Sequence, residues 1–124
     1  MPQTTGEGMR IRSWLLGISV SFVAVGAWAH HGWSSYDAGK IVKIEAPLAD
    51  VRYRNPHAEV GVDYQGARWN VILAPISRME SRGLPASALP AGKVVTIEGY
   101  PRTDGVHELR AERITVDGKT VELR

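Results

Sequence analysis

The residues best suited to chemistry in this sequence are histidines, two of which stand side by side as His30 and His31. Directly before them lies Ala27-Trp28-Ala29, a small-residue pattern of the kind that leader peptidases cleave. Cleavage after Ala29 makes His30 the first residue of the mature chain, where its α-amine and imidazole offer a metal two nitrogens. Borderline-soft divalent ions such as Cu(II) favour nitrogen ligands. The pattern therefore indicates a copper site that forms only when cleavage of the leader during export frees the α-amine of His30.

Two further histidines are candidates for completing such a site. His57 follows Asn55-Pro56 at the entrance to a strand and could be a ligand, or it could hold the turn by bonding to backbone. His107 follows Asp104-Gly105 and is expected to be a solvated loop residue. Cysteine is absent, so any metal must be held by nitrogen or oxygen. We predict a copper site of His30, His31 and His57; the alternative is that the first two are a polar start to the mature chain.

The N-terminal segment has the organisation of an export signal. Arg10 and Arg12 precede an apolar run over residues 14–25, and the small-residue cleavage pattern follows it. Residues 14–29 number 16, short of the roughly 20 that a membrane-spanning helix needs. We predict a signal peptide over residues 1–29, with Met9 as an alternative start. The mature protein is then periplasmic or secreted and meets the membrane only during export.

Length and charge limit what the mature chain can be. The chain has 124 residues, and removal of the leader leaves 95, enough for one small domain. We expect an irregular segment over residues 30–39 and one folded domain over residues 40–124. The mature part carries 13 basic and 12 acidic residues, a balance that gives no electrostatic reason to expect nucleic acid.

Period-two alternation of apolar and polar residues predicts an all-β fold with one short helix. The expected strands are Ile41–Glu45 with Leu48–Tyr53 (one strand bent at Ala46-Pro47), His57–Tyr64, Arg68–Leu73, Lys93–Tyr100, Glu108–Val116 and Thr120–Leu123. Three strands, a helix, two strands and an extension follow the order of a five-stranded, partly open OB-like barrel. A β-sandwich is the alternative, although it usually has seven strands or more. The expected core comprises Val60, Val62, Trp69, Val71, Leu73, Val95, Ile97, Leu109, Ala111 and Ile114.

Turn and cap residues divide these strands. Ser77 is a candidate N-cap for a helix through Arg82, and Gly83 stands where a helix C-terminus commonly has glycine. Asp104-Gly105 and Asp117-Gly118 each lie between β-rich runs, which favours two hairpins.

A resemblance follows from a combination of motifs spread over the mature chain. These are His30-His31-Gly32-Trp33 with Tyr36-Asp37, Asn55-Pro56-His57, Trp69, Leu84 with Leu89, Gly92-Lys93-Val94 and Gly99-Tyr100. In them the sequence resembles an exported bacterial family, domain of unknown function 6152. That family has a glycine in its first strand where this chain has Ala46. The resemblance implies a small, exported, β-rich protein and no particular activity.

The remaining motifs favour binding over catalysis. The sequence has no nucleophile elbow, phosphate-cradling glycine loop or zinc-protease helix, so we do not expect an enzyme. Its aromatic residues suggest an alternative to copper, because OB barrels commonly bind oligonucleotides or oligosaccharides on one face. That alternative is a metal-free binding module for a periplasmic protein partner or an oligosaccharide. The sequence does not set the oligomeric state.

Overall fold

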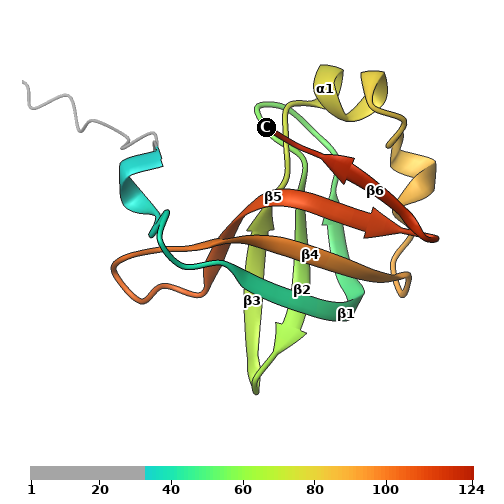
Figure 1. The fold of residues 1–124 in the computed structure, drawn as a ribbon. Helices are drawn as coiled ribbons and strands as arrows, with labels where there is room; N and C mark the ends of the chain where they lie inside the picture. Colours follow the sequence, from blue (N-terminus) through green and yellow to red (C-terminus); the bar gives the residue numbers. More distant parts are fainter. Residues whose placement is uncertain (1–32) are drawn as a thin grey trace, which may run out of the picture.

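The alternation along the chain produces strands that wrap into a barrel (Figure 1). The structure, a computed structural model, describes residues 33–124. Its strands are β1 (Val42–Arg52), β2 (Glu59–Tyr64), β3 (Ala67–Ile72), β4 (Val94–Pro101), β5 (Glu108–Val116) and β6 (Lys119–Glu122). Its helical segments are the 3-10 turn η1 (Trp33–Ser35), the helix α1 (Ile76–Ser81) and the 3-10 turn η2 (Ala86–Ala88). No helix among residues 33–124 has the length and apolar character needed to cross a membrane.

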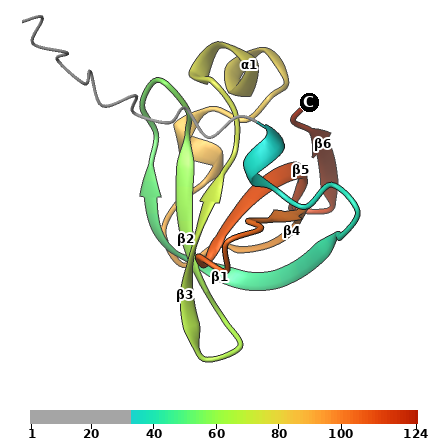
Figure 2. The same ribbon diagram turned by 90° about the vertical axis from the view of Figure 1, so that its left-hand side faces the viewer.

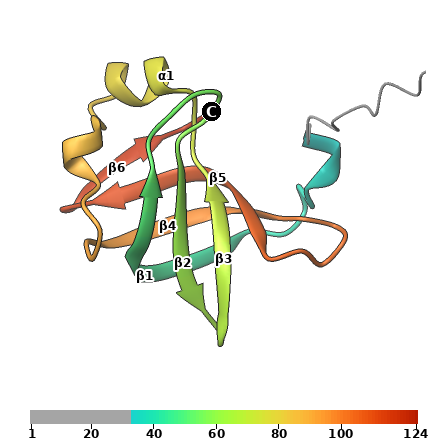
Figure 3. The ribbon, with the colours of Figure 1, turned by 180° about the vertical axis from the view of Figure 1, so that it is seen from behind.

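The strands are ordered β3-β2-β1-β4-β5-β6, with β1, β2 and β3 in front in Figure 3. A parallel pairing of β3 with β5, over residues 70–72 and 108–110, closes the first five strands into a ring. All other pairings are antiparallel, and β6 extends the sheet from β5. The predicted five-stranded OB-like barrel with one short helix is therefore confirmed, and the β-sandwich alternative is not what the chain forms.

The barrel interior holds nearly all of the predicted core. The buried members are Val60, Val62, Val71, Leu73, Val95, Ile97, Leu109, Ala111 and Ile114. Trp69 is the exception, since its side chain is only half-buried. The β3–β5 pairing starts at Asn70, so Trp69 lies where the β2–β3 hairpin projects beyond the closed ring (Figure 2). Its ring stacks on His107 instead, with centroids 5.0 Å apart.

Strand β1 runs without a break through the expected bend. Pro47 still pairs with Val94, and the register shift in β1 falls later, between Leu48 and Asp50. Pro47 is accommodated because Val94 is the first residue of β4, where the ladder ends. Ala46 has no positive φ, so this strand needs no glycine there.

The turn predictions had mixed outcomes. Ser77 is not the N-cap, because α1 begins at Ile76 after Pro75, and the first amide of the helix, that of Ile76, donates to the side-chain oxygen of Asn55 at 3.4 Å. Gly83 follows the helix with a φ of +82°, as predicted. Asp117-Gly118 forms the tight β5–β6 hairpin, with φ values of +50° and +76°. The hairpin predicted at Asp104-Gly105 also forms, since β4 and β5 pair antiparallel. Its loop runs from 102 to 107 and is longer than a two-residue turn, because only Gly105 has the positive φ that such a turn needs at both positions.

Candidate functional site

The predicted metal ligands fall into two groups. His30 and His31 lie outside the described residues. His57 lies between the cis Asn55–Pro56 bond and β2, and its side chain is half-buried. Within residues 33–124, no group of three or more His, Asp or Glu side chains could hold a metal ion. His57 therefore has no carboxylate or imidazole partners there that would complete a site.

The surroundings of His57 favour its neutral form. Burial lowers the pKa of the His57 imidazole, and the positive charges of Arg110 and Arg124 lower it further. Glu59 opposes this shift and Arg78 adds a smaller part to it. A neutral imidazole is the form that binds metals. Burial therefore favours the neutral His57 imidazole, and the charges of the neighbouring arginines would repel a metal ion.

The same two arginines meet an aromatic ring from the N-terminal segment. The guanidinium carbons of Arg110 and Arg124 lie 4.4 and 4.9 Å from the ring centroid of Trp33, within cation–π range. The indole of Trp33 also meets Tyr100 edge-on, with centroids 5.8 Å apart. We call Trp33, Arg110 and Arg124 the arginine–tryptophan cluster. Sequence reasoning did not find it, because Arg110 in β5 and Arg124 after β6 meet Trp33 only once the barrel has formed.

Arg124 is the most unusual member of the cluster. Burial lowers the pKa of its guanidinium to about 10, and the charges of Arg110 and Arg78 act in the same direction. Glu112 partly compensates. The Nε and Nη2 atoms of Arg124 are buried and have no hydrogen-bond partner among residues 33–124. A buried donor without an acceptor costs free energy, so this arrangement requires an explanation.

Backbone and side-chain bonds hold Trp33 in place. Tyr36, three residues later, forms a bridge with Arg102, and its hydroxyl donates to Glu108 Oε2 at 2.7 Å. The Asp37 amide donates to the Pro101 carbonyl at 2.8 Å. These bonds fix the segment after η1 to the end of β4 and the start of β5, so Trp33 of η1 is held against Arg110.

The outer face of the barrel carries a paired polar network. The Asn70 amide donates to Glu59 Oε1 at 3.3 Å and to Glu108 Oε1 at 3.4 Å, which joins β2, β3 and β5. Arg52 of β1 binds Glu59 at 3.2 Å and also bonds to the Asn70 side-chain oxygen. Arg102 binds Glu108 at 3.3 Å. The charges of this network are paired with one another, and Nε of Arg52 lies 3.2 Å from Asp50 as an ion pair without a hydrogen bond among residues 33–124.

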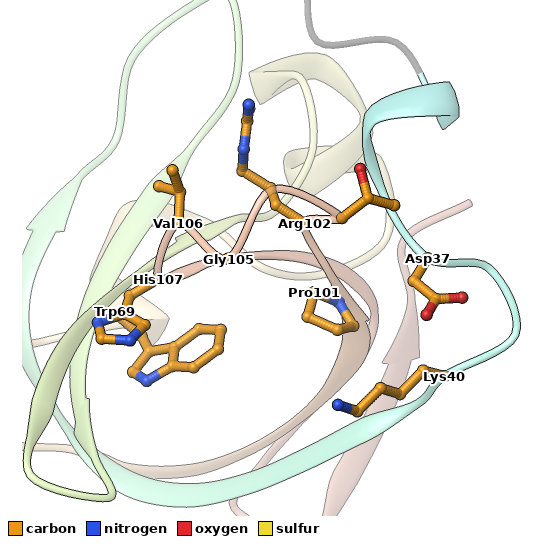
Figure 4. A pocket seen from close by; sticks show the side chains of 9 residues that line it. Asp37, Lys40, Trp69, Pro101, Arg102, Gly105, Val106 and His107 are labelled. Atoms are coloured by element: carbon orange, nitrogen blue, oxygen red, sulfur yellow. The ribbon is translucent and has the colours of Figure 1, made fainter.

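A pocket of about 370 Å³ opens at the barrel mouth, between the 102–107 loop and the start of β1 (Figure 4). Trp69 and His107 form its aromatic wall, and Asp37 and Lys40 face them from the other side. His107 is exposed, as the sequence predicted, but its ring is held by stacking. The size lies within the range typical of small-molecule sites.

Comparison with known proteins supports the fold and the family. Curated proteins give no match. A chain of the S. pombe Stn1-Ten1 complex is similar in structure, with a TM-score of 0.50 and 20% identity. The similarity covers 61% of this chain and 57% of that chain, so this chain spans little more than half of that protein's length. It bears on the fold alone. Residues 18–110 match the family of unknown function DUF6152, which is most of the sequence. The chain therefore belongs to the family DUF6152.

Proposed function

We propose that this protein is an exported, non-catalytic copper-binding protein whose site comprises the His30 amine and imidazole, His31 and His57. One observation carries the proposal: Trp33 and His57 share Arg110 and Arg124 as neighbours. A chain spans at most about 3.6 Å per residue, so residues 30 and 31 stay within roughly 11 Å of Trp33. Trp33 is anchored beside Arg110 and Arg124, so the proposed site requires only that this short stretch of chain turns toward His57.

The donor set suits Cu(II). An α-amine and imidazoles are nitrogen ligands, which Cu(II) binds more strongly than most first-row divalent ions do. The lowered pKa of His57 keeps its ring nitrogen available. Arg110 and Arg124 act against a dication through repulsion, so the affinity depends on the chelating N-terminal residue. The sequence motifs of hydrolases and phosphoryl transferases are missing from the chain, which supports binding rather than catalysis.

Copper titration of the protein with its natural mature N-terminus tests the proposal. One added residue before His30 displaces the free amine, and His57→Ala removes an imidazole. Each change should weaken binding at least about tenfold, since loss of even an indirect ligand contact costs that much. His107→Ala is the control, because His107 lies on Trp69 at the barrel mouth. No binding by the natural form, or unchanged binding in both variants, would reject the site.

Export is part of the same proposal. The intact mass of the protein recovered from the periplasm or medium should correspond to residues 30–124. A recovered chain that retains residues 14–25 contradicts cleavage and removes the amine ligand as well.

The pocket at the barrel mouth favours one alternative, a metal-free module that binds an oligosaccharide or a periplasmic partner. Sugar rings pack on aromatic faces, and Asp37 and Lys40 could bond to hydroxyls. Titration with neutral oligosaccharides, followed through the NMR signals of Trp69 and His107, tests it. Saturable shifts that vanish in Trp69→Ala would support this alternative. Balanced mature charge gives no support to a nucleic-acid partner.

A further inference from the structure

We propose that the arginine–tryptophan cluster is a binding site for an oxyanion, a carboxylate or phosphate group, with Arg124 as its principal donor. The site does not depend on copper, because its residues are Trp33, Arg110 and Arg124 and its ligand is an anion.

The first argument is the arrangement of free donors. The two Arg124 atoms that have no hydrogen-bond partner in the described part of the chain, Nε and Nη2, are neighbouring donors along one edge of the planar guanidinium. This pair is spaced for two oxygens of one carboxylate or phosphate, the bidentate geometry for which arginine is suited. Nε and Nη2 together therefore form a complete bidentate donor pair, which we call the Arg124 fork.

The second argument is the local charge. Arg124 is close enough to Arg110 and Arg78 for both to act on its charge, and Glu112 is the carboxylate that opposes them. Three cations against one carboxylate leave the surroundings of Arg124 positive. Arginine stays protonated in proteins, so the charge cannot be relieved by loss of a proton near neutral pH. An anion bound to Nε and Nη2 of Arg124 would supply both hydrogen-bond acceptors for these donors and a negative charge to balance the surrounding cations.

Access to the fork involves Trp33. Nε and Nη2 are buried, so a neighbouring group must shift to admit a ligand. The Trp33 ring lies against Arg124 and is 43% exposed, which makes it the neighbour on the solvent side. Its contact with Arg110 can persist while it moves from Arg124. Binding should therefore change the environment of the Trp33 indole.

Calorimetric titration of the purified protein with sodium phosphate and with sodium acetate tests the site. Ionic strength is held constant with sodium chloride, because screening alone changes surface electrostatics. We expect saturable binding of at least one anion, with the stronger of the two identifying the preferred group. The tryptophan indole NMR signal of Trp33 should shift with the same midpoint.

Variants separate recognition from general charge. Arg124→Met should weaken binding tenfold or more, and Arg124→Lys should fail to restore it, because lysine keeps the charge and loses the fork. Arg113→Met is the matched control, since Arg113 is an arginine of β5 outside the cluster whose guanidinium is paired with Glu122 at 2.9 Å. Circular dichroism and urea unfolding establish that each variant is folded. The proposal is overturned if the natural protein binds neither anion, if Arg124→Met binds as tightly, or if Arg113→Met loses as much affinity.

Discussion

The hydroxyl of Tyr36 donates to Oε2 of Glu108 at 2.7 Å, which joins the segment after η1 to the first residue of β5. Tyr36 is 4% exposed. Burial, followed by the bond to Glu108, raises the pKa of the Tyr36 phenol well above its ordinary value. The phenol therefore remains a donor throughout the physiological range, and the bond holds Trp33 over Arg110.

Tyr36→Phe keeps the ring and removes this bond. We expect a loss of about 1–2 kcal/mol in the free energy of unfolding, because the acceptor is charged but keeps Arg102 as a partner. Urea denaturation measures it. Tyr100→Phe is a suitable control, since no hydrogen bond through its hydroxyl is recorded among residues 33–124. An equal loss in both variants would contradict a specific role for the Tyr36 bond.

Arg124→Met should change the affinity for Cu(II) and the affinity for an oxyanion in opposite directions. Removing a cation near His57 should strengthen copper binding severalfold, because like charges repel. The same change should weaken oxyanion binding. Parallel titrations with Cu(II) and with phosphate measure both. Changes in the same direction for both ligands would indicate that the substitution disturbs the fold.

Gly99→Ala should be markedly destabilising. A Cβ at Gly99 would lie 2.9 Å from Ala111 Cα and would also collide with the Arg110 carbonyl oxygen. Both are backbone atoms of β5, so β4 and β5 must separate, at a cost of about 1–3 kcal/mol. Gly61→Ala is the matched strand control: its new Cβ meets the Asp50 side chain, which can rotate away. Equal losses in urea denaturation would show that strand separation is not the cause.

Asp104 should contribute stability that disappears in acid. Bonds from Arg102, at 2.9 Å from Nε, lower the pKa of Asp104 to about 2, with help from the Val106 amide. An unfolded aspartate titrates near 3.9, so the unfolded state gains its proton first as pH falls. The difference in unfolding free energy between the natural protein and Asp104→Asn should be constant above about pH 5. It should fall between about pH 4 and pH 2; a difference that stays constant to pH 2 would exclude this linkage.

Trp69→Ala should cost less than a substitution in the closed barrel. Full burial of tryptophan would imply about 3–5 kcal/mol, but a half-buried ring should lose roughly half of that. Leu109→Ala, at a fully buried position, should cost about 2–5 kcal/mol. Equilibrium unfolding of the two variants gives the comparison. A larger loss for Trp69→Ala would mean that the stack on His107 carries more of the fold than its burial implies.

Local signals in the sequence predicted most of the strands. Alternation identified the inward residues of β2 and β5, since the period of two is a property of the extended backbone itself. Asp117-Gly118 identified the β5–β6 hairpin through another local property, since both residues accept the positive φ of a tight turn. Asp104-Gly105 carries the same dipeptide, yet Arg102 binds the Asp104 carboxylate and the loop is longer. That side-chain contact is itself local, since Arg102 is two residues from Asp104, and only Gly105 of the pair has a positive φ.

The sequence by itself determined the order and inward faces of the strands, the barrel they form and the family to which the chain belongs. Those properties depend on residues close together in the chain or on motifs that can be matched one by one. Only the tertiary structure placed Trp33 against Arg110 and Arg124 and left Trp69 outside the closed ring. The reason is that both outcomes depend on strand register and on where the β3–β5 pairing ends. Contacts between residues about 77 and 91 positions apart leave no periodicity in the sequence, so no local pattern could have predicted them.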